Sequence, residues 1–338
     1  MKYTPQDFKS NQEVKWCPGC GDFSILAAVQ RAFPTICEDL GYTKERFVFV
    51  SGIGCASRFP YYMDTYGFHG IHGRAAAIAT GVKVANPQLT VWQISGDGDA
   101  LAIGGNHFIH AIRRNIDINI LLHNNQIYGL TKGQYSPTSK LGKVTKTSPF
   151  GTVEHPFSPG ELVLGARGTF FARSIDAEVK LTEEIMVASA KHDGTAVTEI
   201  LQNCVIFNDK THSDITDKAV RQDRTIVLRH GEPMIFGINK DKGLMLDGLQ
   251  LKVVRIGEKG ITEKDLLVHN AKESNPGLHM MLINMQGPDY PVALGVIRAV
   301  EDKTYDENVL NQIREVQAKC KIKCVDDLLH SGTTWEIK

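Results

Sequence analysis

The chain has 338 residues, of which 42% are hydrophobic, so it is long enough to bury one large core or one core plus an extension. Its 38 Lys and Arg residues balance 38 Asp and Glu residues, which argues against a broad surface for binding nucleic acid. No apolar run approaches the roughly 20 residues of a membrane span, and the amino terminus lacks the apolar core of a signal peptide, so we expect no membrane association.

The first distinctive segment is Cys17-Pro18-Gly19-Cys20, in which two thiols two residues apart can bind one metal centre. Such a motif occurs in redox dithiols, in zinc sites and in iron–sulfur sites. Here it follows a polar arm, whereas a thioredoxin-like dithiol would stand between a strand and a helix. Seven cysteines without a signal peptide fit a reducing compartment, and we therefore expect a cytoplasmic location.

A further cysteine follows the apolar run Val48-Phe49-Val50, in the segment Ser51-Gly52-Ile53-Gly54-Cys55. Cys55 is thus expected at the carboxyl end of a strand, where open α/β sheets bind ligands. Cys37, Cys320 and Cys324 are interpreted as structural thiols, since nothing nearby completes a metal site around the last two.

Two polar motifs close neighbouring apolar runs in the middle of the chain. The run 90–95 ends at Gly96-Asp97-Gly98-Asp99, and the run 118–123 ends at Asn124-Asn125-Gln126, with a helix expected over 104–115 between them. A strand, helix, strand unit makes two parallel strands with a right-handed crossover, which brings Asp97 and Asn125 to the same edge. A carboxylate and an amide oxygen suit Mg²⁺, and the glycines let the backbone approach phosphate closely. The two motifs predict a site for Mg²⁺ and a diphosphate.

The second half of the chain supplies one more candidate ligand and an extension. Residues 140–160 are expected to form an irregular loop, after which the apolar run 196–200 leads toward Cys204, which would converge with Cys55. Long apolar runs stop near residue 210. We therefore expect an α/β domain over residues 1–210, built on a parallel sheet with helices on both faces. Residues 211–338 would form a C-terminal extension that packs on the core and on a partner, with a strand at 292–297 and a helix at 307–319.

The order of these motifs resembles the thiamine diphosphate-binding β subunit of the two-subunit 2-oxoacid:ferredoxin oxidoreductases. The resemblance spans roughly residues 14–210. It is carried by the segments 16–22, 51–55, 72–74, 96–99, 124–131 and 134–138.

The resemblance assigns roles to individual residues. It implies that the backbone carbonyl of Ile127 joins Asp97 and Asn125 as a Mg²⁺ ligand. It also implies that one [4Fe-4S] cluster is held by Cys17, Cys20, Cys55 and Cys204. The residues expected to contact thiamine diphosphate are Ile53, Gly54, Cys55, Ala56, His72, Gly96, Gly98, Asp99, Gly129 and Leu130.

Three residues are candidates for a catalytic role. His72 belongs to the segment His72-Gly73-Arg74 that carries the resemblance. Arg58 and Lys132 fall in motif loops, where a cation could steady the substrate carboxylate or the diphosphate, although a solvated surface role is the alternative for both.

No glutamate in the motifs is placed to activate the cofactor, and in the two-subunit enzymes this residue lies on the α subunit. The resemblance therefore implies an active site completed by an α subunit, in an αβ or (αβ)2 assembly. The expected reaction converts 2-oxoglutarate and CoA to succinyl-CoA and CO2, and electrons pass singly through the cluster to ferredoxin. The reaction could also run toward carboxylation.

Three alternatives to this function remain open. Pyruvate is an alternative substrate for the same enzyme. A non-oxidative thiamine-dependent lyase or synthase would use the same Mg²⁺ site without needing the cysteines. A zinc-stabilised scaffold would use the cysteines and leave the Gly-Asp-Gly turn incidental.

Overall fold

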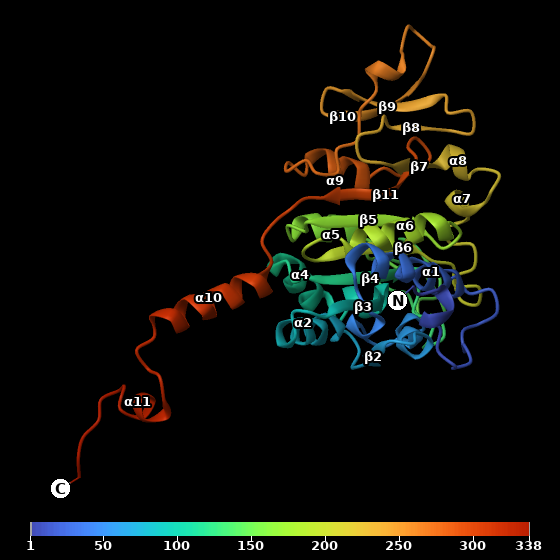
Figure 1. Ribbon diagram of the computed structural model, residues 1–338. Helices are drawn as coiled ribbons and strands as arrows, with labels where there is room; N and C mark the ends of the chain where they lie inside the picture. Colours follow the sequence, from blue (N-terminus) through green and yellow to red (C-terminus); the bar gives the residue numbers. More distant parts are fainter. Residues whose placement is uncertain (1, 338) are drawn as a thin grey trace.

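The computed structural model describes residues 2–337, and its centre is an eight-stranded, mostly parallel sheet (Figure 1). The strand order is β2-β1-β3-β4-β6-β5-β11-β7, and every neighbouring pair is parallel except β5 with β11. The strands are β1 (Phe47–Ser51), β2 (Tyr66–His69), β3 (Thr90–Gly96), β4 (Ile118–Asn124), β5 (Phe170–Ile175), β6 (Ala196–Leu201), β7 (Thr225–Leu228) and β11 (Val292–Ala299).

The strand, helix, strand unit predicted from the two polar motifs is confirmed. Strands β3 and β4 pair in parallel, with Gly96 opposite His123, and helix α4 (Gly105–Arg114) connects them. The helix ends at Asn115, whose left-handed backbone (φ 51°) stops the helix and returns the chain to the sheet. This register brings the residues after Gly96 and His123 side by side at one sheet edge.

Helices cover both faces of the sheet, as expected. Alternate strand residues divide between two apolar cores, so that Ile120 and Leu122 of β4 enter one core and Leu121 enters the other. Helices α2 (Ala75–Ala85), α4, α5 (Pro159–Gly165) and α9 (Gly277–Ile283) contribute to the first core, and α1 (Asp22–Leu40) and α6 (Val179–Ala190) contribute to the second.

The shorter helical segments lie mainly in the connections. They are α3 (Asp97–Leu101), α7 (Ser213–Thr216), α8 (Arg221–Arg224) and the 3-10 turns η1 (Pro5–Phe8), η2 (Lys44–Arg46), η3 (Ala56–Tyr62) and η4 (Glu263–Asp265). Within residues 2–337, none of the helices combines the length and apolar character that a membrane crossing requires.

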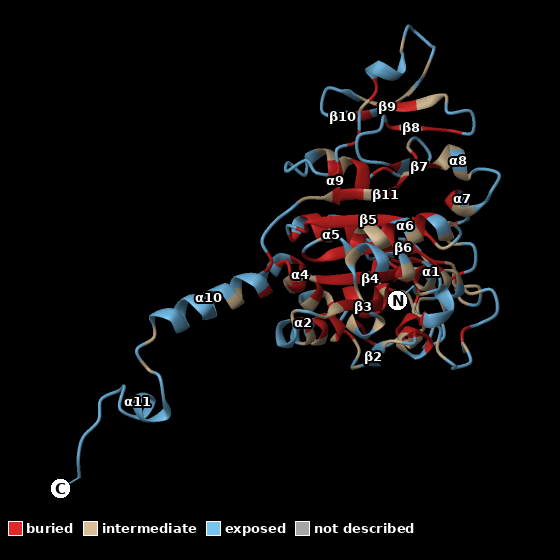
Figure 2. Ribbon diagram, viewed as in Figure 1, coloured by how far each residue is buried: buried red, intermediate tan, exposed pale blue. Residues whose placement is uncertain are grey.

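The region after residue 210 both completes the core and projects from it. Strands β7 and β11 belong to the main sheet. This sheet therefore includes strands from both sides of residue 210, where the sequence analysis placed the end of the α/β domain. A small antiparallel sheet of β8 (Ile235–Phe236), β9 (Lys242–Asp247) and β10 (Gln250–Arg255) extends beyond it. Helices α10 (Tyr305–Lys319) and α11 (Val325–Leu329) lead away from the body, and Figure 2 shows them almost wholly exposed.

Candidate functional site

The carboxyl ends of β1, β3 and β4 border a cavity of about 530 Å³. Its walls contain every residue predicted to contact the cofactor and each predicted Mg²⁺ ligand, and Tyr128, Thr131 and Gln134 complete the lining. Motifs that are far apart in the sequence therefore meet at one place, because parallel strands deliver their carboxyl ends to the same edge.

Asp97 is the carboxylate at the base of this cavity, and its side chain is buried. Its Oδ2 accepts hydrogen bonds from the hydroxyls of Ser136 and Thr138, each at 2.5 Å. Burial nevertheless raises the pKa of Asp97 to about 6, because the charged form has lost its water. A bound cation would offset this loss, so the environment of Asp97 fits a metal ligand.

The other predicted Mg²⁺ ligands lie in a tight turn after β4. Asn125 Oδ1 accepts a hydrogen bond of 3.1 Å from the backbone N–H of Ile127, which orients the amide oxygen within the turn. Together with Asp97, this turn offers one carboxylate, one amide oxygen and one backbone carbonyl along the cavity wall. Such a set of hard oxygen donors fits Mg²⁺ bridged to a diphosphate.

Gly98 is required by close packing at this wall. A Cβ at Gly98 would lie 2.3 Å from Cε1 of Tyr128, and the Tyr128 hydroxyl donates a hydrogen bond of 2.9 Å to the Gly98 carbonyl oxygen. Any side chain at this position would displace the tyrosine from the cavity lining.

Asp99 organises the opposite wall. Its buried carboxylate accepts hydrogen bonds at Oδ1 from the backbone N–H groups of Ile53 (3.1 Å) and Gly73 (2.7 Å) and lies 2.8 Å from His72 Nδ1. Because a carboxylate can only accept, Nδ1 is the donor in this hydrogen bond. His72 is therefore held in one orientation, with Nε2 left for a ligand in the cavity.

The two other candidate catalytic residues do not line the cavity. The guanidinium of Arg58 donates a hydrogen bond of 3.5 Å to the carbonyl oxygen of Lys15. Its positive charge opposes the rise in the pKa of Cys55, so Arg58 lies near the cysteines and outside the cavity wall. Lys132 is exposed, with a left-handed backbone (φ 76°), in the turn that follows Gly129.

The cysteines predicted to bind a cluster gather beside the cavity. A Cβ at Gly129 would lie 3.5 Å from the Sγ atoms of both Cys55 and Cys204. The segments of the other two cysteines adjoin this pair: the Gly21 N–H donates to the Asn203 carbonyl oxygen (3.2 Å), and Trp16 Nε1 donates to the Cys55 carbonyl oxygen (2.7 Å). All are free thiols, and burial raises the pKa of Cys55 to about 11 and also raises that of Cys20.

No three His, Cys, Asp or Glu side chains within residues 2–337 form a group that could hold a single metal ion. The cysteines of an iron–sulfur cluster bind different iron atoms, so their sulfur atoms need not converge on one point. The gathering of thiols around Gly129 is compatible with a cluster in this respect.

Two charged residues that the sequence analysis missed support the turn after β4. Arg173 and Glu199 form a buried ion pair (Nε to Oε2, 2.7 Å), and Glu199 Oε1 accepts a hydrogen bond of 2.7 Å from Asn124 Nδ2. The sequence does contain a signal for this pair, because Arg173 and Glu199 each lie inside an apolar run. A charged residue in a buried strand is rare unless an opposite charge pairs with it.

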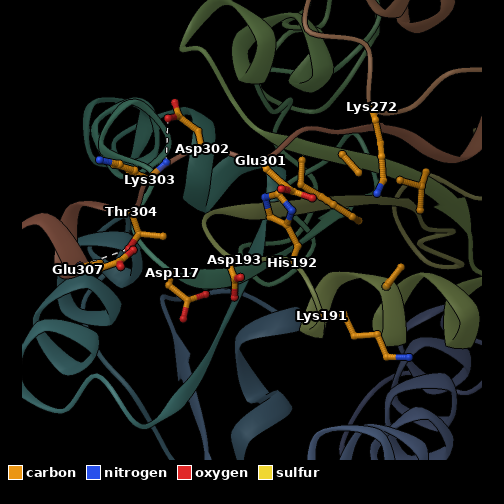
Figure 3. Close-up of a pocket in the computed structure, with 14 residues that line it drawn as sticks. Asp117, Lys191, His192, Asp193, Lys272, Glu301, Asp302, Lys303, Thr304 and Glu307 are labelled. Carbon is orange, nitrogen blue, oxygen red and sulfur yellow. Dashed lines mark hydrogen bonds between the residues drawn. The ribbon is translucent and has the colours of Figure 1, made fainter.

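A larger cavity of about 800 Å³ lies at the opposite edge of the sheet (Figure 3). Charged side chains of both signs line it, from the turns before β4 and β6 and from the segment after β11. It contains none of the predicted site residues, so the chemistry favours the smaller cavity.

Comparison with known proteins finds a matching family and several relatives. Residues 52–200 match the family described as "Thiamine pyrophosphate enzyme, C-terminal TPP binding domain". The 2-oxoglutarate oxidoreductase subunit KorB of Mycobacterium tuberculosis is 47% identical over 336 residues, which cover 98% of this chain and 88% of that relative. Subunit beta of 2-oxoacid:ferredoxin oxidoreductase 1 from Aeropyrum pernix is 48% identical over 57% of this chain and 60% of its own length.

A solved structure is similar along almost the whole chain. It is the 2-oxoglutarate:ferredoxin oxidoreductase from Magnetococcus marinus, solved with 2-oxoglutarate, coenzyme A and succinyl-CoA bound. The TM-score is 0.77 at 32% sequence identity, and the match covers 98% of this chain and 97% of that one.

Proposed function

The chain belongs to the family of 2-oxoacid:ferredoxin oxidoreductase β subunits, and from this premise we propose that it binds Mg²⁺ and thiamine diphosphate in the cavity at the carboxyl ends of β1, β3 and β4. As a subunit of an oxidoreductase, it would act with an α subunit in the oxidative decarboxylation of 2-oxoglutarate with CoA. The observation that carries the proposal is that both polar motifs and Cys55 line one cavity, with the Sγ atom of Cys204 beside Gly129 in its wall.

Each side chain in the cavity has a role in this proposal. Asp97, Asn125 and the Ile127 carbonyl would hold Mg²⁺ against the diphosphate. When bound, thiamine diphosphate supplies the carbon nucleophile and the electron sink that removal of CO2 from a 2-oxoacid requires. Asp99 fixes His72 so that its free Nε2 can orient a bound group by accepting a hydrogen bond from it.

The cysteines would hold one [4Fe-4S] cluster, which accepts electrons singly and passes them to ferredoxin. Gly129 lines the cavity and also adjoins the Sγ atoms of Cys55 and Cys204, which supports a short path from cofactor to cluster. Burial disfavours the thiolate forms of Cys20 and Cys55 in the absence of a metal, and iron would compensate for this.

An α subunit is needed to complete the site. No glutamate is among the residues that line the cavity, so the carboxylate that activates the cofactor must come from elsewhere. Apolar residues at the cavity mouth are exposed, with Ile53 at 36% and Leu130 at 43%, which supports cover by a partner in an αβ or (αβ)2 assembly. The exposed apolar residues Ile313 and Val316 of α10 support a second contact between residues 211–338 and that partner.

An anaerobic assay of the αβ complex tests the proposal. With 2-oxoglutarate, CoA and oxidised ferredoxin, we expect succinyl-CoA and reduced ferredoxin, and about four iron and four sulfide per β chain. Release of CO2 without reduction of ferredoxin, from protein that lacks iron, would instead favour a non-oxidative thiamine enzyme. The kcat/KM values for 2-oxoglutarate and for pyruvate identify the preferred substrate, which is the one with the higher value. Their ratio measures the specificity of the enzyme.

A further inference from the structure

The loop that carries Asn125 is held in part by residues 202–212, a segment that begins at the end of β6 and contains Cys204. The backbone N–H of Gln202 donates to the Asn124 carbonyl oxygen at 3.0 Å, and His212 Nε2 lies 3.1 Å from the same oxygen. The metal-binding loop is therefore fixed from outside as well as by its own turn.

Asn208 is the central contact between the two segments. Its buried side chain donates from Nδ2 to the carbonyl oxygens of Asn125 (2.9 Å) and Gln126 (3.3 Å). Its Oδ1 accepts a hydrogen bond from the Lys143 ammonium, and a lysine can only donate, so this contact fixes which end of the amide faces the loop. Its backbone N–H donates to the carbonyl oxygen of Cys204 at 3.0 Å.

The loop needs such support because its backbone is unusual. Gln126, between the two predicted Mg²⁺ ligands Asn125 and Ile127, has a left-handed conformation (φ 56°), which is unfavourable for a residue other than glycine. The hydroxyl of Ser139 donates to the Gln126 carbonyl oxygen (2.7 Å) and that of Thr211 to its side-chain oxygen (3.1 Å). External hydrogen bonds therefore maintain the turn that aims both ligands.

We propose that Asn208 is a positioning residue that holds the Mg²⁺-binding loop and joins it to the segment of Cys204, so that Mg²⁺–thiamine diphosphate binding and cluster formation are linked. The inference rests on the proposed function, because it needs both groups to bind where that proposal puts them. Linkage is reciprocal: a cluster that orders residues 204–208 strengthens cofactor binding, and the cofactor strengthens cluster retention equally.

Two substitutions of Asn208 distinguish the effect of its hydrogen bonds from the effect of its packing. Asn208→Ala removes the side chain. Asn208→Asp keeps the shape and the acceptor for Lys143 but replaces the two N–H donors with a carboxylate oxygen facing two carbonyl oxygens. Asn203→Ala is the matched control, since Asn203 lies in the same segment and bonds Asp209 and Lys210 without reaching the metal-binding loop.

The measurement is the Kd of Mg²⁺–thiamine diphosphate for the intact αβ complex, by anaerobic calorimetry, with the cluster present and after its removal. For Asn208→Ala we expect a Kd raised roughly tenfold with the cluster present, as for one lost buried hydrogen bond, and for Asn208→Asp at least as large a rise. We expect kcat at saturating cofactor to change much less than the Kd. Asn203→Ala should bind like the wild type. Removing the cluster should raise the Kd of the wild type but not that of Asn208→Ala.

The possible results discriminate between the proposals. Wild-type affinity in both Asn208 variants would overturn the positioning role, and an unchanged wild-type Kd after cluster removal would overturn the linkage. A wild-type complex that binds no thiamine diphosphate would overturn the proposed function, and the inference with it. Thermal unfolding of Asn208→Asp, which retains the Lys143 contact, establishes that a weaker Kd does not reflect a misfolded chain.

Discussion

The buried ion pair between Arg173 and Glu199 gives the sharpest quantitative prediction. The two residues are direct register partners on β5 and β6, and their side chains are 8% and 2% exposed. Glu199 also accepts the hydrogen bond from Asn124, the residue before the proposed Mg²⁺ ligand Asn125. One carboxylate therefore stabilises both the sheet and the loop that carries Asn125.

Removing one charge leaves the other buried without its partner. We expect Arg173→Met and Glu199→Met each to lower the free energy of unfolding by about 3–5 kcal/mol, the usual penalty for an uncompensated buried charge. In the double variant both charges are gone and apolar volume replaces them, so the remaining loss is about 1–3 kcal/mol, from the unpaired amide of Asn124.

Guanidinium unfolding of the αβ complex at one fixed protein concentration measures these differences, because subunit association also stabilises the fold. The double variant should be more stable than either single variant, yet bind Mg²⁺–thiamine diphosphate more weakly than the wild type, since Asn124 has lost its acceptor. Strictly additive losses, or a double variant with wild-type cofactor affinity, would refute this account of the pair.

Three further predictions follow from the site and from the buried histidines. Asp97→Ala should weaken Mg²⁺–thiamine diphosphate binding by a factor on the order of 100 or more, because the variant lacks the charged ligand proposed for Mg²⁺; anaerobic calorimetry of the αβ complex checks this. Gly98→Ala should push Tyr128 out of the cavity lining and lower the free energy of unfolding by about 1–3 kcal/mol, measurable by urea unfolding. Burial lowers the pKa of His279, which accepts a hydrogen bond from Arg298 at 3.0 Å, so stability should fall as the pH drops below the ordinary histidine pKa of 6.5, where the unfolded chain takes up the proton first. His279→Gln should reduce that loss between pH 7 and about 5.5, and an unchanged slope would contradict the assignment.

The sequence predicted the elements whose signals are local. The apolar runs of β3 and β4 and the helix between them lie within one continuous stretch, and their periodicity and length define the unit without reference to the rest of the chain. The position of Asp97 and Asn125 at one edge then follows from the parallel pairing of the two strands. This is why the cavity could be assembled from motifs.

What the sequence could not predict depends on pairing between distant segments. Asn208 lies 83 residues from Asn125, and nothing in its neighbourhood marks it as different from any loop asparagine. Arg173 and Glu199 become partners only because β5 lies beside β6 in the sheet. Strand β7 has four residues, too few for a periodic signal, so its place in the main sheet was not foreseen.

The strand order explains how one edge of the sheet could hold both proposed metal centres. Strands β1, β3, β4 and β6 are consecutive neighbours, and the segments after them carry Cys55, Asp97, Asn125 and Cys204 in that order. The proposed Mg²⁺ ligands thus come from the two inner strands and the cysteines from the two outer ones. Cys55 and Cys204, which follow the two outer strands, approach each other beside the chain that follows Asn125. In that chain, Gly129 is the residue next to both sulfur atoms. Because glycine adds no side chain between the cavity and the thiols, it would let the two proposed centres adjoin, as the proposed electron transfer requires.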